Sequence, residues 1–476
     1  MKESNRLFSA MGLLLLLNAL IKPLWIFGVD RQVQNLNGTE AYGLYFSLLG
    51  LALSGSFLLD WGMSGYINRR LAADPAFQQD NAGRLLLLKF LQAVLYSILL
   101  LLIALYTGVT EWEWLILLAA IQIMNAFFLF MRALITARQW FKAEAWFSVF
   151  DKGLMLLFCG TILLLPLSGG LDILLFLRIQ LGCTIIAALA AFLFLRYRGQ
   201  SFHFKKGEPL RRLFREALPF AVIVMLMSVH NRLDAFLLER IHPEGAYQAG
   251  IYAGAYRLLD AGNIAGYLVA SLLLPFLAAQ GGAGPPARKA ILVSRHILLL
   301  FSIAAGVTAY CLATPLQQLL YHNQDAAAVQ VLQFCLPVLV AYSVIHVYGT
   351  VLTAFGWLKQ FSLIVLAGLL LNILFNLWWI PAYGATGCCY AALVSQGLTA
   401  AAVYWLAIKK NSISHHTRSW IVYILSGFIL FCFLYFGKIW IPVPWILLFS
   451  GGMLYVLFAR VWLGPDLFLY FRMIKK

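Results

Sequence analysis

The sequence is short of charge. Only 11% of its 476 residues are Asp, Glu, Lys or Arg, against about 25% in a typical soluble domain, and its mean hydropathy is +0.83. Acidic residues are especially scarce, with 19 Asp and Glu against 35 Lys and Arg, which gives a formal net charge of +16. This composition excludes an ordinary soluble domain and indicates a protein that crosses a membrane many times.

The sequence also lacks the common motifs of catalysis and metal binding. It has no HExxH, no P-loop and no Gly-rich dinucleotide turn, so we predict no catalytic residue, no metal, no cofactor and no direct use of ATP. All seven cysteines fall in apolar stretches, and the vicinal pair Cys388–Cys389 is too tight for metal-ligand spacing. We expect the cysteines to pack as small apolar side chains.

About fourteen apolar stretches are each long enough to cross a bilayer, which takes roughly 20 residues of helix. We predict spans at 8–28, 40–66, 84–106, 112–137, 145–168, 171–195, 213–239, 245–278, 290–312, 327–355, 358–381, 385–408, 419–437 and 443–463. The stretches 245–278 and 327–355 are long enough for a tilt, a kink or an interfacial extension. The predicted fold class is therefore an all-α polytopic membrane protein.

Basic residues are distributed unevenly between the two sides of this arrangement. With the N-terminus inside, about 25 Lys and Arg, Arg295 among them, fall on the cytoplasmic side, and only Arg31, Arg240 and Lys438 fall outside. This bias predicts an even number of spans with both termini in the cytoplasm. Because the basic residues are scattered over many short loops, nucleic acid is not an expected partner, whereas the lipid bilayer is.

The longest polar connection, Arg196–Arg212, divides the spans into two groups. We predict an N-terminal lobe at 1–198, a cytoplasmic linker at 199–212, a second lobe at 213–410 and two further spans at 411–476. Glu40–Tyr45 and Tyr247–Tyr252 both place Gly-aliphatic-Tyr at the start of the second span of their half. This echo favours a six-span repeat, a plan common in transporters, although chance similarity of apolar sequence is an alternative.

Charged residues inside the predicted spans are the candidates for function, because a charge at membrane depth is costly and rarely persists without a task or a partner. The candidate cavity cations are Lys22, Lys152, Arg178, Arg232 and Arg257, and the candidates for ion or proton coupling are Asp60, Asp234, His230 and Asp260. For the histidine, a structural role is the alternative to a proton relay.

Helical spacing sorts these charges into pairs and single residues. Arg257 and Asp260 share a face and can pair, and Asp234 shares a face with His230. Lys152 adjoins Asp151, but adjacent residues do not share a helix face. Arg132, a further intramembrane cation, lies near the inner surface and can extend its side chain towards it.

Two cations have no acid nearby in the sequence. Lys22, which shares a face with Asn18, and Arg178 both lie deeper in their spans. Each must therefore meet an acid from another helix or a water-filled cavity that admits an anion.

Aromatic and amide side chains on the spans are candidates for sugar contacts. These are Tyr45, Tyr252, Tyr256, Asn372 and Asn376. Packing between helices, or hydrogen bonding across them, is the alternative for each residue.

Three stretches resemble a known family. Asn372–Gly387 contains an Asn-rich helix, then Ile-Pro-Ala-Tyr-Gly, then a small-residue helix, which is similar to polysaccharide-biosynthesis flippases of the multidrug/oligosaccharidyl-lipid/polysaccharide (MOP) superfamily. Asn37–Tyr45 and Leu218–Asp234 resemble the O-antigen flippase branch of that superfamily. The resemblance covers most of the chain, including the number of spans.

The resemblance implies two six-helix lobes around a V-shaped cavity, two extra C-terminal spans, and alternating access. It implies that an undecaprenyl-pyrophosphate-linked glycan moves across the bacterial inner membrane, with cavity cations holding the pyrophosphate or acidic sugars. We also expect a monomer, with other polysaccharide-assembly membrane proteins as candidate partners. The alternatives are a multidrug-type cation antiporter and a lipid II flippase. A glycan polymerase or ligase is disfavoured, because every external loop is short.

Overall fold

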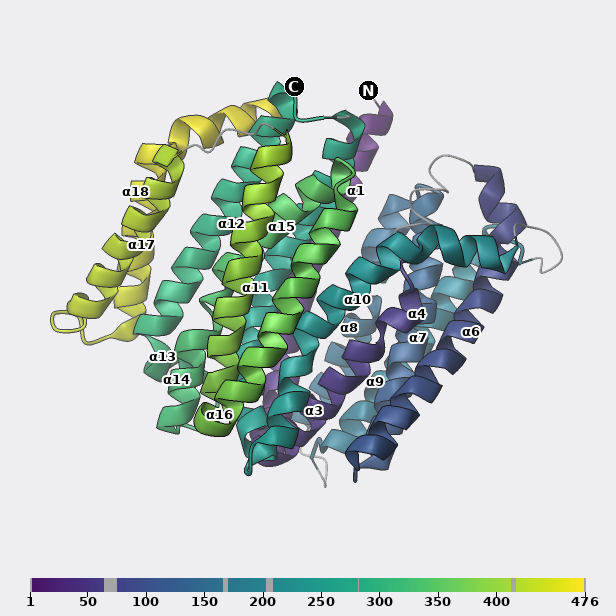
Figure 1. Ribbon diagram of the computed structural model, residues 1–476, viewed down its shortest axis with the longest axis horizontal. Helices are drawn as coiled ribbons and strands as arrows, with labels where there is room; N and C mark the ends of the chain where they lie inside the picture. Colours follow the sequence, from purple (N-terminus) through teal and green to yellow (C-terminus); the bar gives the residue numbers. More distant parts are fainter. Residues whose placement is uncertain are drawn as a thin grey trace. The chain divides into compact units, whose positions relative to one another are not determined.

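The computed structural model describes residues 2–63, 75–165, 170–202, 209–280, 282–411 and 417–474, and its regular elements are helices (Figure 1). The helices of the first half are α1 (Lys2–Trp25), a π-helical turn (Ile26–Asp30), α2 (Arg31–Asn37), α3 (Thr39–Gly55), α4 (Phe57–Asp60), α6 (Pro75–Thr107), α7 (Trp112–Ala137), α8 (Phe141–Leu164), α9 (Ile173–Tyr197) and α10 (Leu210–Ile241). Those of the second half are α11 (Gly245–Gln280), α12 (Pro285–Cys311), α13 (Ala313–Leu320), α14 (Ala326–Cys335), α15 (Val338–Ala354), α16 (Leu358–Asn411), α17 (Thr417–Gly437) and α18 (Pro444–Ile474). Part of the predicted linker, 203–208, and several loop cations, including Arg69, Arg70, Lys205, Lys206, Lys475 and Lys476, lie outside the described residues.

The number of helices that can cross a membrane agrees with the sequence. Within the described residues, 13 helical stretches are long and apolar enough. One of them is the 54-residue α16, which breaks at Gly384, where φ is 53° and ψ is −131°. Counting the two halves of α16 separately turns 13 into 14, and the predicted fold class is confirmed.

The two longest predicted spans have different helical structures. The stretch predicted at 327–355 is two helices, α14 and α15, which meet at Leu336–Pro337. The stretch predicted at 245–278 is one continuous helix, α11, with Pro275 inside it.

Residue contacts divide the chain into two compact units, Met1–Arg240 and Ile241–Lys476. The helix after the predicted linker, α10, therefore lies in unit 1. There Ser228 Oγ donates to the carbonyl oxygen of Leu53 on α3 at 2.8 Å. A Cβ atom at Gly50 of α3 would lie only 2.7 Å from the carbonyl oxygen of Arg232, so glycine permits this close approach. The six-span lobe boundaries stay a prediction.

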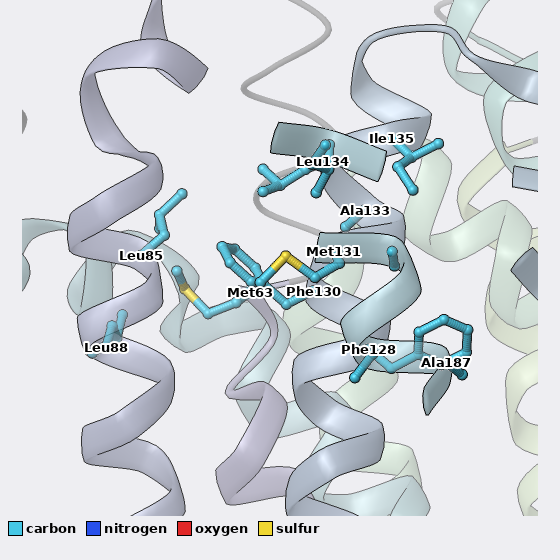
Figure 2. Close-up of a cluster of buried hydrophobic side chains, with 13 residues drawn as sticks. Met63, Leu85, Leu88, Phe128, Phe130, Met131, Ala133, Leu134, Ile135 and Ala187 are labelled. Atoms are coloured by element: carbon cyan, nitrogen blue, oxygen red, sulfur yellow. The ribbon is translucent and has the colours of Figure 1, made fainter. Parts of the chain in front are cut away.

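The interior of unit 1 is apolar and built by several helices. Its core includes Met63, Leu85 and Leu88 from the α4–α6 region, Phe128–Ile135 residues from α7, and Ala187 and Leu195 from α9 (Figure 2). Further contacts join α1 to α8, α8 to α9 and α3 to α7. Many apolar side chains outside the core, such as Leu102 and Leu105, are exposed, as expected for a surface that faces lipid.

The first span changes helical form after a proline. Pro23 lies inside α1, where it removes a backbone donor. The π-helical turn Ile26–Asp30 follows, and α2 then continues to Asn37. Tyr42 donates a hydrogen bond to the Asp30 carboxylate at 2.8 Å, which ties the π-helical turn to α3.

Unit 2 is organised around α15, which contacts α11, α12 and α16, and α12 further contacts α17 and α18. The break in α16 is held from α11, because the backbone N–H of Ala385 donates to Gln248 Oε1 at 3.0 Å. Cys311, Leu430 and Leu447 belong to an apolar cluster that joins α12, α17 and α18. All seven cysteines are free thiols and six are fully buried, so their assignment as packing residues agrees with the structure.

Candidate functional site

Unit 1 contains a cluster of charged side chains on α1, α7 and α8. We call Lys22, Arg132, Glu144, Asp151 and Lys152 the Lys22 cluster. Helices α1 and α8 are in contact, and Asn18 Nδ2 of α1 donates to Ser148 Oγ of α8 at 2.7 Å. Lys22 follows Asn18 by one helical turn, and Asp151 and Lys152 follow Ser148 by one turn, so the two charged faces meet.

Lys22 is half-buried at the centre of this cluster. The charged groups that act electrostatically on it are Arg132, Asp151 and Lys152. Among the described residues, none forms a hydrogen bond or an ion pair with its ammonium group. The sequence led us to expect that an acid from another helix balances Lys22, and Asp151 of α8 is that acid. Asp151 acts on Lys22 only from a distance, because its direct partner is Lys152.

Arg132 pairs with Glu144 instead of extending towards the inner surface. Both its Nε and its Nη2 donate to Glu144 Oε1, at 3.1 and 2.6 Å. The two side chains are only 20% and 11% exposed. Sequence analysis missed Glu144 because it placed the start of this span at 145, whereas α8 begins at Phe141.

Lys152 pairs with its neighbour Asp151, and this result corrects the sequence argument that adjacent residues cannot meet. The Nζ atom lies 3.3 Å from Asp151 Oδ2. The long, flexible lysine side chain bends back along the helix, which the face rule does not consider. The same Nζ lies 4.4 Å from the centre of the Trp25 ring on α1, a cation–π distance.

The Lys22 cluster contains three cations and two carboxylates, so it has a surplus of one positive charge. It also has unused hydrogen-bonding atoms. Within the described part of the chain, Trp25 Nε1 is a buried donor without an acceptor, and Glu144 Oε2 is a buried acceptor without a donor. Surplus charge and an open donor together suit an anionic group that accepts hydrogen bonds.

Two other predicted residues of unit 1 have direct ionic partners. Arg178 lies in the second turn of α9, nearer the helix end than predicted, and its Nη2 is 2.8 Å from Glu113 Oε1. Their side chains are 58% and 59% exposed, so the pair lies at the surface. Asp60 lies 3.6 Å from the Nζ atom of Lys89, which also donates to the Leu59 carbonyl oxygen at 2.7 Å.

The charged residues of α10 lie where the helical spacing predicts. His230 and Asp234 are buried, at 3% and 4% exposure, and lie one turn apart on the same side of the helix. Arg232 is half-buried, and its backbone packs against Gly50. A direct contact between His230 and Asp234 stays a prediction.

In unit 2, polar side chains gather on one region of α11 facing α15. Arg257 is 8% exposed and Asp260 is half-buried, and their pairing stays a prediction. One turn further on, Asn263 Oδ1 lies 2.8 Å from His346 Nε2 of α15. The His346 ring also packs against Tyr267, with ring centres 4.7 Å apart. This histidine thus has a structural hydrogen bond.

The candidate sugar-contacting residues are mostly buried. Tyr45 is 1% exposed and packs edge-on against Phe176, with ring centres 6.0 Å apart; its contact with a sugar stays a prediction. Tyr252 and Tyr256 are 2% and 4% exposed.

The two asparagines of α16 lie inside that helix pair. Asn372 donates to Ser395 Oγ at 3.3 Å, and Asn376 donates to Asn372 Oδ1 at 3.1 Å. They therefore join the two halves of α16, which is the packing alternative that the sequence left open.

Sequence analysis missed two further buried cations. Lys89 is 4% exposed and Arg295 is 2% exposed, although Arg295 was assigned to the cytoplasmic loops. The sequence signal was present, because both residues lie within apolar stretches. No group of three or more His, Cys, Asp or Glu side chains in the described residues is placed to hold a metal ion.

Comparison with known proteins gives a family and a fold. The family described as "Polysaccharide biosynthesis protein" matches residues 12–279. No curated protein sequence matches the chain. Among solved structures, the lipid II flippase MurJ in an inward closed conformation is similar with a TM-score of 0.69 and 13% identity, covering 95% of this chain and 99% of that one.

Two other transporter structures share the fold. An inward-facing multidrug resistance MATE family transporter of the MOP superfamily has a TM-score of 0.65 and 14% identity, covering 83% of this chain and 94% of its own. A MOP superfamily transporter from Pyrococcus furiosus has a TM-score of 0.61 and 16% identity, with coverage of 85% and 94%. Reversed polarity of that transporter's binding pocket is said to suggest a different function.

Proposed function

The chain belongs to the polysaccharide biosynthesis protein family, and from this premise we propose that it is a MOP-superfamily flippase for a lipid-linked oligosaccharide. The proposed substrate is an undecaprenyl-pyrophosphate-linked repeat unit of O-antigen or another surface polysaccharide. It moves from the cytoplasmic to the periplasmic leaflet of the bacterial inner membrane by alternating access. We propose that the protein works as a monomer, with both termini cytoplasmic and other polysaccharide-assembly membrane proteins nearby.

The observation that carries this proposal is the surplus positive charge of the Lys22 cluster. Lys22 is half-buried, forms no ion pair with any residue that the structure describes, and lies among Arg132, Asp151 and Lys152. A pyrophosphate offers several anionic oxygens, and ammonium and guanidinium groups recognise such oxygens directly. In our proposal the pyrophosphate binds Lys22 and accepts a further hydrogen bond from Trp25 Nε1, whose N–H is open.

The other buried charges have proposed supporting roles. Arg232 and Arg257 remain candidate substrate contacts in α10 and α11. The groups proposed for ion or proton coupling are Asp60, Asp234, His230 and Asp260, of which Asp60 already pairs with Lys89. We leave Arg178 out of the proposed site, because its partner is Glu113 at the exposed start of α7.

A cation antiporter is the contrasting transporter hypothesis. An organic cation needs a carboxylate-rich site, whereas the Lys22 cluster has more cations than acids. A lipid II flippase is closer, because that substrate also has a pyrophosphate. The similarity that covers 95% of this chain is to a lipid II flippase, and loss of viability on deletion is the result that would favour this substrate.

The proposal is tested by neutralising Lys22 in the native host. We expect Lys22→Gln to abolish surface glycan and to accumulate the lipid-linked precursor in the inner leaflet, at an unchanged level of the protein. Lys142→Gln is the matched control, because Lys142 is an exposed cation near the start of α8, and it should keep normal glycan. Normal glycan in Lys22→Gln would reject the site, and efflux of organic cations by the wild type would reject the substrate class.

A further inference from the structure

Arg295 of α12 is a fully buried cation in unit 2 that the proposed function does not use. Its side chain is 2% exposed. Its Nε donates to the hydroxyl of Tyr423 on α17 at 3.2 Å, and its Nη1 donates to the hydroxyl of Tyr348 on α15 at 3.3 Å. The guanidinium carbon lies 5.6 Å from the centre of the Trp420 ring. Three helices thus enclose this one charge.

Among the described residues, no carboxylate acts on this charge, and the titratable groups that do are Tyr348 and Tyr423. The helices α12 to α17 contain no Asp and no Glu. His296, the next residue on α12, bonds to Tyr423 through Nδ1 and adds no negative charge. Buried charges in proteins are normally paired, because transfer of an isolated charge out of water is very costly.

Two donor atoms beside this charge are open. Its Nη2 is buried and has no hydrogen-bond partner among the described residues. The Tyr348 hydroxyl accepts from Arg295, so its own proton is available for donation. A cationic fork beside a hydroxyl donor, with no acid present, recognises an anion that accepts several hydrogen bonds.

The surroundings favour a phosphate group as that anion. Lys409, Lys410 and Arg418 each lie over a tryptophan ring, at 4.6, 4.6 and 5.9 Å. Mixed basic and aromatic side chains of this kind occur at the level of lipid headgroups. Arg418 precedes Tyr423 by five residues on α17, which is about 7.5 Å along the helix axis. Arg295 therefore lies close to the depth of this belt.

We propose that Arg295, Tyr348, Tyr423 and Trp420 form a buried phosphate-binding site in unit 2, separate in composition from the Lys22 cluster. The phosphate comes either from an anionic lipid headgroup or from solution, and both present the same oxygens to the guanidinium. The bound anion supplies the negative charge that the protein lacks here, and it thereby stabilises the packing of α17 against α12 and α15.

The test is the thermal stability of the purified full-length protein with and without a phosphate source. One arm titrates inorganic phosphate into protein in neutral detergent at constant ionic strength, with chloride as the comparison anion. The other arm compares vesicles of phosphatidylcholine alone with vesicles of equal parts phosphatidylcholine and phosphatidylglycerol. We expect a saturable rise in Tm for the wild type in at least one arm, and the arm that responds identifies the source.

Variants then assign the effect to this site. Arg295→Gln should weaken phosphate or lipid binding about tenfold to a hundredfold, as expected for loss of a charge-assisted hydrogen bond. Tyr348→Phe removes one hydroxyl and keeps the packing, so it should weaken phosphate or lipid binding less than Arg295→Gln does. It also keeps the test valid if Arg295→Gln does not fold. Arg288→Gln is the matched control, because Arg288 is exposed on the same helix, and it should behave as wild type.

Two results would overturn the proposal. The first is a wild-type Tm that responds to neither phosphate source. The second is an equal response in the wild type and in both site variants, which would mean that the anion acts elsewhere.

Discussion

The ion pair between Arg132 and Glu144 is the shorter of the two ion pairs described in the Lys22 cluster, and its removal should be measurable as lost stability. Arg132 donates twice to one carboxylate oxygen, at 3.1 and 2.6 Å, and both side chains are mostly buried. Glu144→Gln removes the acceptor charge and leaves Arg132 beside Lys22, with which it already interacts electrostatically. Arg132→Met removes the donor and leaves a buried carboxylate.

The magnitude follows from burial. Breaking a fully buried pair by removing one partner costs about 3–5 kcal/mol, and the residual exposure of both side chains lowers our expectation to about 2–4 kcal/mol for each single variant. Glu144→Gln should be the costlier one, because three cations then face a single carboxylate. The double variant should cost less than the sum, with a coupling of about 2 kcal/mol.

The assay is equilibrium unfolding of the purified protein in mixed detergent micelles, carried out on the wild type, both single variants and the double variant. Lys142→Gln again serves as the control for loss of an exposed charge on α8, and we expect it to change stability by less than about 0.5 kcal/mol. If the two single effects simply add to give the double effect, the pair does not act as a unit and the reasoning fails.

Three further predictions concern backbone geometry and a second buried pair. Gly384→Ala should destabilise the protein by at least about 1–2 kcal/mol, because φ is 53° there and an added Cβ would lie 2.5 Å from Gln248 Oε1; unchanged unfolding would show that α16 does not need this break. Gly50→Val should lower the stability by about 1–3 kcal/mol through overpacking against the Arg232 carbonyl. Gly153→Ala is the control and should not lower it, because open space surrounds the added Cβ there. Equal effects of the two substitutions would contradict the close approach of α3 and α10. Lys89→Met should cost about 1–3 kcal/mol by breaking the bond to Leu59 and the pair with Asp60, measured in the same unfolding assay; a stability equal to that of the wild type would mean that water replaces both contacts.

Hydropathy alone predicted the helices well, since apolar length determines which segments can span a bilayer. The break at Gly384 lies at a predicted boundary, because one predicted span ends at 381 and the next begins at 385. The sequence did not predict the positive φ value at this glycine. Charge placement was harder, because which way a side chain points depends on the helices packed around it. Thus Arg295 was counted with the loops, yet it is enclosed by tyrosines from α15 and α17.

Sequence spacing could not predict which charged side chains pair between different helices. Glu144 was missed because the predicted span began at 145, four residues after the start of α8 at Phe141, and the partner of Arg132 therefore went unseen. The bond between Asp151 and Lys152 violates a rule about helix faces that holds for short side chains and not for a four-carbon lysine. The approach of Asn18 to Ser148, by contrast, explains why the predicted Lys22 face meets α8.

The central claim is that the Lys22 cluster binds the pyrophosphate of a lipid-linked substrate, and a binding measurement tests it most directly. Wild-type protein and Lys22→Gln, in phosphatidylcholine nanodiscs, are titrated with undecaprenyl pyrophosphate and with uncharged undecaprenol. We predict that the wild type prefers the pyrophosphate and that Lys22→Gln binds it about tenfold to a hundredfold more weakly, with undecaprenol binding unchanged. Equal affinity of both proteins for undecaprenyl pyrophosphate would contradict the claim.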